Sequence, residues 1–318
     1  MTRSRIVDRF EQGGDGGQEH VAAHVVGDTD EQQQALRAQL SGMWASVAGS
    51  WGEYADYADA RGAAVTARML QLTAPQQGDR VLELACGAGG VGLAAASLVG
   101  ATGEVVLSDV VAEMTSIAGL RALEAGLGNV TTRRLALEDI DEPDGSFDVV
   151  LCREGLMFAI DPGRALAEIR RVLRSGGRVA VAVWGPRMRN PWLGLVFDAV
   201  SAQLGTPLPP PGVPGPFSLA DTVRLAALFG DADFAQVDVT ELPTPLLDKS
   251  FDDWWVRTSS LAGPLAKRLA TLPDGAMRAL RGRLKQAVRP YETPAGLEFP
   301  GVTLLASGRR DAAPIESG

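Results

Sequence analysis

Short apolar segments alternate with helical patterns between residues 80 and 184. The apolar segments have the length of strands and cover residues 80–85, 104–108, 130–135, 147–152 and 178–184. Helical patterns follow at 91–99 and 112–125, and a further helix is expected to start at Pro162, with Asp161 as its cap. Apolar strands that are joined by helices are typical of a parallel sheet covered on both faces. The chain is therefore predicted to form a doubly wound α/β domain.

The residues before the first strand predict a helical N-terminal region. Residues 1–28 are rich in glycine, glutamine and charge, and we expect a poorly ordered tail there, as we do at 311–318. Helical patterns cover about 29–44 and 61–72. Four aromatic residues lie at the end of the first helix and between the two: Trp44, Trp51, Tyr54 and Tyr57. We expect 29–75 to form one helical segment and 76–310 to form the main domain.

The pattern changes after Pro186. Ser175, Gly176 and Gly177 are predicted to end the preceding helix, and six prolines between 207 and 216 exclude regular structure in that stretch. Helical patterns return near 192–204, 219–229, 251–261 and 274–288, and strand patterns appear at 235–241 and 301–307. The main domain is therefore expected to carry two inserts, at 186–233 and 243–298.

Charge and composition argue against several classes of function. The net charge is −9 and the sequence pI is about 4.9, so the field of the protein disfavours a nucleic-acid partner. No apolar run approaches the roughly 18 residues of a membrane span, and the first residues lack the apolar core of a signal peptide. Cys86 and Cys152 lie in apolar surroundings, which predicts two core thiols in a cytoplasmic protein.

A glycine-rich turn closes the first strand and opens the first helix. Gly87, Gly89 and Gly92 have the G-x-G-x-x-G spacing, in which glycines let a ligand approach the backbone and helix N–H groups point at it. Alone, this spacing also fits a tight turn without a ligand. It fits NAD as well as S-adenosylmethionine.

Glu83 and the later part of the chain favour S-adenosylmethionine over NAD. A carboxylate at Glu83, just before the turn, would repel a pyrophosphate but suits the ammonium group of a methionine moiety. Asp109 ends the second strand, where an acid can accept hydrogen bonds from both ribose hydroxyls, although it could instead cap the next helix. The later part of the chain shows no second nucleotide-binding half, which further disfavours a dehydrogenase.

Four segments resemble the successive motifs of class I S-adenosylmethionine-dependent methyltransferases: VLELACGAGG, LSDVVAEM, LEDIDEPDGSFDVVLC and EIRRVLRSGGRVAVAVW. The resemblance is greatest to the bacterial ubiquinone/menaquinone branch and its natural-product relatives, and it covers about residues 40–307. It implies a Rossmann-like, mostly parallel seven-stranded sheet of order 3-2-1-4-5-7-6. It also implies a helical lid at 29–75 and an acceptor-side cap formed by the two inserts.

The resemblance further implies roles for individual residues. The cofactor-binding set would be Glu83, Ala85, Cys86, Gly87 and Gly89 at the methionine moiety, Asp109 at the ribose, Val110, Met114, Leu137 and Glu138 at the adenine, and Cys152, Arg153 and Leu156 beneath the sulfonium. Two positions depart from the family pattern. Ala85 replaces a common glycine, which is tolerable if its φ stays negative. Ala136 replaces the acid that bonds the adenine amino group, so that contact would pass to Glu138 or Asp139 or be lost.

Catalytic candidates are few. Methyl transfer from a sulfonium is an in-line displacement that needs alignment and a dry site more than a base. His20 and His24 fall in the expected tail, and without a third ligand we expect no metal there. Glu154, after the fourth strand, is the first choice for a polar contact to the acceptor; a rim carboxylate or a salt bridge to Arg153 is the alternative. Tyr54 is the first choice among the lid aromatics, which could cage the sulfonium or simply pack.

The second insert carries a basic run made of Lys267, Arg268, Arg278, Arg281, Arg283, Lys285 and Arg289. We interpret it mainly as a solvated helix face, with docking of an acidic carrier protein or a phosphorylated substrate as the alternative. Trp254 and Trp255 are candidates to line an acceptor pocket.

The leading hypothesis is methyl transfer from S-adenosylmethionine to a small, hydrophobic acceptor such as a secondary metabolite or a quinone-like compound. The first alternative is an enzyme of the same fold that catalyses a cyclisation or elimination with the cofactor bound structurally. An NAD-dependent oxidoreductase and a non-catalytic binding module come after it. No membrane or nucleic-acid partner is expected.

Overall fold

The computed structural model describes residues 18–210 and 213–311, with side chains from residue 31 onward. Contacts divide the chain into two units, residues 1–40 and 41–318, and helix α1 (Gln18–Ala45) belongs in part to each. This helix begins at Gln18, so the predicted start of the first helix near residue 29 is wrong, and α1 extends into the stretch 1–28 for which a poorly ordered tail was predicted. Residues 18–28 contain alanine, glutamate and glutamine, which favour helix, and their one glycine costs only about 1 kcal/mol. Residues 1–17 and 312–318 lie outside the described part.

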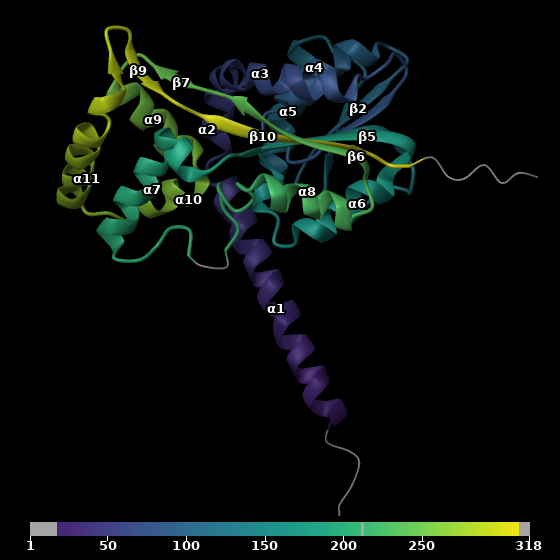
Figure 1. Cartoon of the computed structure of the whole chain (residues 1–318), viewed down its shortest axis with the longest axis horizontal. Coiled ribbons are helices and arrows are strands. Elements are labelled where there is room, and N and C mark those ends of the chain that lie inside the picture. The colour runs from purple at the N-terminus through teal and green to yellow at the C-terminus, as the bar shows by residue number, and fades with distance from the viewer. Residues whose placement is uncertain (1–17, 211–212, 312–318) are drawn as a thin grey trace, which may run out of the picture. The chain divides into compact units, whose positions relative to one another are not determined.

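A seven-stranded sheet forms the centre of the second unit, in the order β3-β2-β1-β4-β5-β10-β6 (Figure 1). Its strands are β1 (Arg80–Glu83), β2 (Glu104–Asp109), β3 (Val130–Arg134), β4 (Phe147–Arg153), β5 (Leu173–Trp184), β6 (Ala235–Pro243) and β10 (Val302–Arg309). The first five run parallel, and β10 is antiparallel to both β5 and β6. When β6 and β10 are counted as the sixth and seventh strands, this is the order 3-2-1-4-5-7-6 expected from the sequence.

Helices cover both faces of the sheet, as Figure 1 shows. One apolar core joins the sheet to α6 (Pro162–Val172) and α8 (Thr222–Asp231). The other joins it to α3 (Ala55–Thr73), α4 (Gly90–Val99) and α5 (Ala112–Glu124). Because the inner strands are buried on both faces, they consist of continuous apolar runs. Asp161 caps α6 as expected, by accepting a hydrogen bond from the Arg164 N–H at 2.9 Å.

Strand β5 starts before the glycines that were predicted to separate it from the helix. Leu173 already pairs with Phe147, and after an irregularity Val149 pairs with Arg178. Gly176 has a φ of +76°, which lets the strand bend here and pair with β4 again from Arg178 onward. The extra residues were missed because Ser-Gly-Gly has the composition of a break.

Most of the two inserts shares an apolar core of its own, whereas α8, which was predicted as part of the first insert, packs on the sheet. The core of the inserts is built from α7 (Pro191–Leu204), α9 (Phe251–Leu261), α10 (Gly263–Leu269), α11 (Asp274–Ala287) and a small sheet in the order β7-β9-β8. The strands of that sheet are β7 (Leu246–Asp248), β8 (Glu292–Thr293) and β9 (Gly296–Phe299). Trp254 is fully buried at its centre, and its Nε1 donates to the Trp192 carbonyl at 3.0 Å. The sequence analysis did not identify α10 or this sheet.

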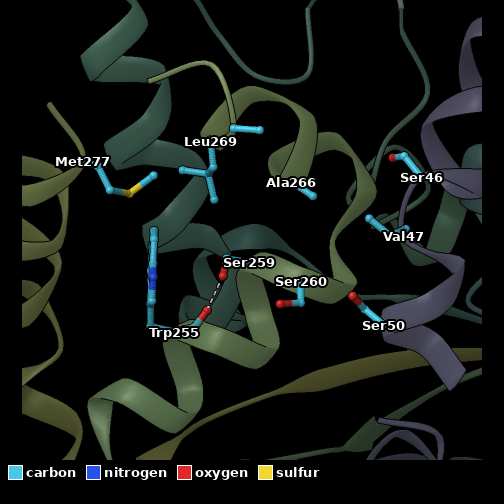
Figure 2. A pocket seen from close by; sticks show the side chains of 10 residues that line it. Ser46, Val47, Ser50, Trp255, Ser259, Ser260, Ala266, Leu269 and Met277 are labelled. Carbon is cyan, nitrogen blue, oxygen red and sulfur yellow. Dashed lines mark hydrogen bonds between the residues drawn. The ribbon is translucent and has the colours of Figure 1, made fainter. Parts of the chain in front are cut away.

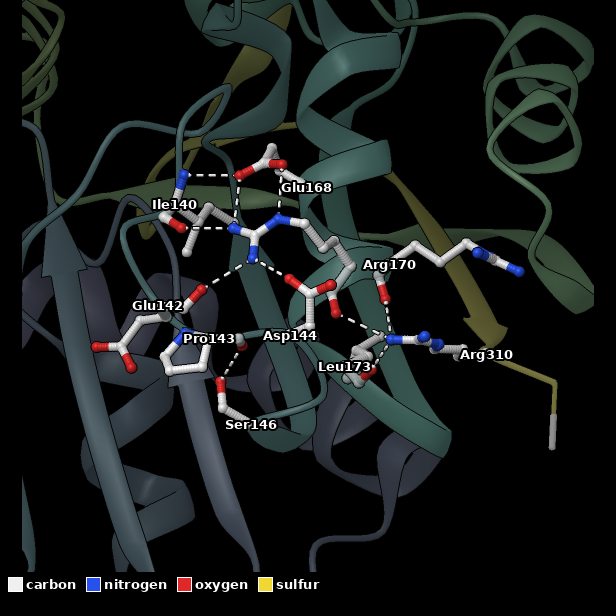
Figure 3. A network of polar contacts seen from close by, with 10 residues as sticks. Ile140, Glu142, Pro143, Asp144, Ser146, Glu168, Arg170, Leu173 and Arg310 are labelled. Atoms are coloured by element: carbon white, nitrogen blue, oxygen red, sulfur yellow. Dashed lines mark hydrogen bonds and ion pairs between the residues drawn. The ribbon is translucent and has the colours of Figure 1, made fainter. Parts of the chain in front are cut away.

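The remaining elements are short: α2 (Ala48–Glu53) and the 3₁₀ turns Leu156–Phe158, Arg187–Arg189 and Arg289–Tyr291. Arg171 holds the long loop between β3 and β4 through hydrogen bonds to Ile140, Glu142 and Asp144, which Figure 3 labels. Its guanidinium donates to the carbonyls of Ile140 and Glu142 and to the carboxylates of Asp144 and Glu168. The loop is thereby tied to α6, which holds the preceding residues 136–138 at the edge of the sheet.

Candidate functional site

The carboxyl ends of β1, β2 and β4 meet at one edge of the sheet, where parallel α/β sheets bind ligands. The glycine-rich turn lies at this edge and is closed by backbone hydrogen bonds: the Cys86 N–H donates to Ser108 O, and the Gly89 N–H to Cys86 O. Gly87 and Gly89 have φ values of +52° and +88°. A side chain at Gly92 would collide with Leu107, so the third glycine lets α4 pack against β2.

Asp109 joins the turn to the end of β2. Its Oδ2 accepts a hydrogen bond from the Gly87 N–H at 3.1 Å, and its Oδ1 accepts one from the Val111 N–H at 3.0 Å. Burial raises the pKa of this carboxyl, while the backbone donors act to lower it. Each oxygen keeps further lone pairs that two ribose hydroxyls could use.

Glu83 is nearly inaccessible beneath the turn. It is 2% exposed, and its Oε2 accepts a hydrogen bond from the Gly92 N–H at 2.8 Å. Burial raises the pKa of Glu83 to about 7, and the nearby Arg153 guanidinium and the N–H groups of the first turn of α4 act against that shift. A cation placed at this carboxylate would stabilise its charged form.

Ala85 adopts the left-handed backbone conformation. Its φ is +51°, so the condition under which an alanine is tolerable at this position, a negative φ, is not met. The turn needs this conformation to reverse direction after β1, whichever residue stands there. Gly155 makes room for the alanine methyl, since a Cβ at Gly155 would lie 2.5 Å from the Ala85 Cβ.

The residues expected beneath the sulfonium lie at the end of β4 and directly after it. Cys152 and Leu156 are fully buried, and burial raises the pKa of the Cys152 thiol to about 12, which keeps it protonated. The Nη1 of Arg153 donates to Thr66 Oγ1 at 2.9 Å, and its Nη2 lies 3.6 Å from Asp59 Oδ1. The guanidinium is therefore bound to α3. Gly62 permits this approach, because a Cβ there would collide with Nη1.

The expected adenine side is only partly open. Val110 is 37% exposed, whereas Met114 packs with Val111 and Ala48 beneath the N-terminal segment. Leu137 packs against the sheet core. Oε1 of Glu138 accepts a hydrogen bond from the Ile160 N–H at 2.7 Å, so this carboxylate holds the loop before α6.

The loop that contains Glu138 also contains Ala136, which has no side-chain group to bond the adenine amino group. Ala136 forms an isolated bridge with Asp139, whose side chain is exposed. The adenine amino contact that Ala136 cannot make remains a prediction for Glu138 or Asp139.

Two tryptophans of the N-terminal segment lie over this edge of the sheet. Trp44 packs edge-on against Phe158, with ring centroids 4.9 Å apart. The Trp51 ring lies 3.8 Å from the position that a Cβ would take at Gly87, and its Nε1 donates to the Leu261 carbonyl at 3.1 Å. The segment from Trp44 to Trp51 thus contacts the glycine-rich turn, the β4 loop and the second insert.

The polar candidates form two ion-paired groups on the acceptor side. Glu154 pairs with Arg61 of α3, at 2.9 Å, rather than with Arg153. Burial acts to raise the pKa of Glu154, but Arg61, Arg153 and a hydrogen bond from Trp184 lower it below its usual value. The Arg61 guanidinium lies over the rings of Trp184 and Trp192, at 5.8 and 5.2 Å from their centroids.

The second group contains Tyr57 rather than Tyr54. The Tyr57 hydroxyl donates to Asp248 Oδ2 at 3.4 Å, and Asp248 pairs with Arg257, whose guanidinium lies over the Tyr57 ring. Burial raises the pKa of Asp248 to about 6. Tyr54 caps the start of α3 and is half-buried. Sequence reasoning missed Arg61 and Asp248 because Glu154 and Tyr57, their partners, lie 93 and 191 positions away along the chain. Arg257 was missed with Asp248, to which it is paired.

The remaining candidates from the sequence, the basic run of the second insert and the two histidines, do not belong to these two groups. Arg281 pairs with Asp252, and Arg283 hydrogen-bonds Gln203, so part of the basic run holds α11 in place. The side chains of His20 and His24 lie outside the described part. Among the residues whose side chains are described, no group of histidine, cysteine and acidic residues has metal-binding geometry. No helix within 18–210 and 213–311 is long and apolar enough to cross a membrane.

Comparisons with known proteins identify the fold. Residues 81–177 match the family model of the methyltransferase domain. This segment is similar to a methyltransferase domain of the class I type. The ubiquinone/menaquinone C-methyltransferases UbiE of Ectopseudomonas mendocina and Azotobacter vinelandii are 38% and 36% identical over 133 residues, which is 42% of this chain and 52% of theirs. The chain thus spans about half the length of the curated relatives it matches.

Solved structures agree at the level of the fold. YcgJ of Bacillus subtilis matches with a TM-score of 0.54 and 21% identity, over 78% of this chain and 98% of that one. The [4+2]-cyclase SpnF matches with a TM-score of 0.51 and 19% identity, over 78% and 81%. The predicted fold is confirmed. The match of residues 81–177 to the methyltransferase domain supports S-adenosylmethionine as the cofactor.

The residues at the edge of the sheet fit that cofactor. Glu83 and Asp109 would offer carboxylates to its ammonium and ribose groups, and the nearby Arg153 guanidinium is hydrogen-bonded to Thr66 of α3. The turn between them is formed by glycines with positive φ. A cationic ligand with two adjacent hydroxyls matches this set of acceptors.

Proposed function

We propose that this chain transfers a methyl group from S-adenosylmethionine to a small, hydrophobic acceptor of the quinone-like or secondary-metabolite class. The bound cofactor would supply an electrophilic methyl group on its sulfonium. Glu83 and Asp109 would fix the two ends of the cofactor, and the backbone of Ala85, Cys86, Gly87 and Gly89 would lie against the methionine moiety. The remaining assignments are Val110, Met114, Leu137 and Glu138 near the adenine and Cys152, Arg153 and Leu156 near the sulfonium.

Two aromatic residues, Trp184 at the carboxyl end of β5 and Trp192 of α7, support the proposed class of acceptor. Trp184 and Trp192 meet edge to face, with ring centroids 5.2 Å apart, beside the ion pair of Arg61 and Glu154. Flat aromatic surfaces that adjoin one polar pair suit a ring with a few oxygen substituents. The names of the relatives, which methylate carbon in ubiquinone and menaquinone biosynthesis, agree with a quinone-like ring.

The polar pair would orient the acceptor rather than remove a proton. Arg61 and Arg153 hold Glu154 in its charged form, so its free lone pairs can accept a hydrogen bond from an acceptor hydroxyl. That hydrogen bond would raise electron density on the ring, and the lid and cap would exclude water from the displacement. Tyr54 remains a proposed contact at the entrance from the lid, and Tyr57 has the better-defined hydrogen bond.

Calorimetric titration with S-adenosylhomocysteine, with NAD as the control, tests the cofactor part. Micromolar binding of the first alone supports it, and binding of NAD alone contradicts it. The protein is then incubated with S-adenosylmethionine and a reduced naphthoquinone that lacks a ring methyl group. Formation of S-adenosylhomocysteine together with methylated product supports methyl transfer. Conversion of an acceptor without S-adenosylhomocysteine would instead favour the non-methylating alternative.

A further inference from the structure

A pocket lies between the N-terminal segment and the second insert, outside the cofactor-binding residues (Figure 2). Its volume is about 330 Å³, which is the lower end of the range for small-molecule sites. Ser46, Val47 and Ser50 line one side. The other side is formed by Trp255, Ser259 and Ser260 of α9, Ala266 and Leu269 of α10, and Ala270 and Met277 beyond it.

The lining has a definite chemical character. No charged side chain contributes to it, and four of its ten residues carry a hydroxyl. Ser259 donates to the Trp255 carbonyl at 2.7 Å, so its oxygen still has lone pairs free to accept. Among the described residues, the hydroxyls of Ser50 and Ser260 have no protein partner. The rest of the lining is apolar, with Trp255, Leu269 and Met277 as its largest side chains.

The wall formed by residues 46–50 separates this pocket from the glycine-rich turn. Ala48, on the opposite side of this wall from the pocket, is buried against Val111 and Met114. Trp51 follows directly and lies against Gly87. A molecule in the pocket would therefore contact the back of the segment that covers the cofactor turn.

We propose that this pocket is a second small-molecule site, which binds an uncharged, mainly apolar molecule with one or two hydrogen-bonding groups and thereby strengthens cofactor binding. The apolar body packs on Trp255, Leu269 and Met277, and the polar group bonds the hydroxyls of Ser50 and Ser260. The bound molecule holds residues 46–50 against α9 and α10, which keeps Trp51 over Gly87. Because coupling between two sites is reciprocal, the cofactor strengthens binding in the pocket by the same factor.

A fluorescence titration with N-phenyl-1-naphthylamine, a neutral apolar fluorophore with one N–H donor, tests the site. The wild-type protein is expected to bind one equivalent. Ala266→Phe fills the pocket and is expected to weaken this binding at least tenfold, whereas Ala227→Phe, on the exposed side of α8, leaves it unchanged. Ser50→Leu, on the opposite wall, is a second test if the first variant is unstable. Unchanged probe binding in a folded pocket variant overturns the proposal.

The coupling is measured by titrating S-adenosylhomocysteine with and without saturating probe. The affinity of the wild-type protein is expected to rise about threefold to tenfold with the probe, and that of Ala266→Phe is expected to be the same in both conditions. An equal wild-type affinity with and without bound probe overturns the coupling. Loss of S-adenosylhomocysteine binding in every protein would contradict the cofactor assignment, and the probe titration reports on the pocket independently.

Discussion

Asp59 of α3 accepts a hydrogen bond from Arg121 of α5 at 2.6 Å, and Arg121 also donates to the Ala88 carbonyl in the glycine-rich turn at 2.7 Å. The same carboxylate lies 3.6 Å from Arg153, which acts on Glu83. Asp59 therefore connects the N-terminal helical region to both sides of the cofactor turn. Gly90 permits its approach, because a side chain there would collide with the carboxylate.

The Asp59→Asn variant is expected to bind S-adenosylhomocysteine about fivefold more weakly than the wild-type protein, because Arg121 and Arg153 lose the charge that orients them. A partly exposed pair of this kind contributes about 1 kcal/mol, which corresponds to that factor. Calorimetric titration measures this change in the affinity for S-adenosylhomocysteine. Asp56→Asn is the matched control, since Asp56 also lies near Arg121 but is fully exposed. Equal effects of the two substitutions would mean that the connection to the turn has no role in binding.

The contact between Ala85 and Gly155 predicts a compensating pair of substitutions. Gly155→Ala places a methyl group 2.5 Å from the Ala85 Cβ and 2.9 Å from the Cys152 sulfur, so we expect a loss of about 2 kcal/mol in the free energy of unfolding. Ala85→Gly removes the left-handed alanine and is expected to stabilise the fold by about 1 kcal/mol. In urea denaturation, the double variant should recover part of the loss through relief of the Ala85 contact. Strict additivity would show that the two methyl positions do not interact.

Local sequence signals account for the sheet but not for the polar contacts of the site. The strands β1, β2, β4 and β5 contain apolar runs bounded by turns, which predicted the strands, and the resemblance to a known family predicted their order. β7, β8 and β9 are two to four residues long, too short for a periodic pattern to show. The Arg61–Glu154 pair joins residues 93 positions apart, and Tyr57 reaches Asp248 across 191. Such partners depend on how the inserts fold back over the sheet, which no local pattern encodes.

The Asp109→Ala variant is expected to lose cofactor binding while it keeps the fold. Two hydrogen bonds to a charged acceptor contribute about 1.5–3 kcal/mol each, so we expect at least a hundredfold loss of affinity for S-adenosylhomocysteine. Circular dichroism and thermal unfolding check that the protein is folded. Affinity within threefold of the wild-type value would remove Asp109 from the ribose site.

The raised pKa of Glu83 predicts that stability falls as the pH rises. The folded protein holds the proton up to about pH 7, whereas the unfolded chain releases it near the ordinary glutamate pKa of 4.5. Between these values the folded state binds more protons, so the free energy of unfolding decreases with pH, by about 3 kcal/mol in total. The Glu83→Gln variant has no titrating carboxyl at this position, so its free energy of unfolding lacks this contribution. The stability of the wild-type protein relative to this variant should therefore fall from pH 4.5 to 7 and level off above it, and a flat difference would contradict the assignment.

The Glu154→Gln variant distinguishes an orienting carboxylate from a general base. A base would give a rate that rises with pH through its pKa, and its removal would change the shape of the profile. Arg61 and Arg153 hold the pKa of Glu154 below its usual value, so the residue stays charged throughout pH 6–9. We therefore expect turnover with a quinol acceptor to fall about tenfold at every pH in that range, with parallel profiles for the two proteins. Arg61→Lys keeps the charge beside Glu154 and should lose less activity. Profiles that diverge with pH would mean that Glu154 takes a proton from the acceptor.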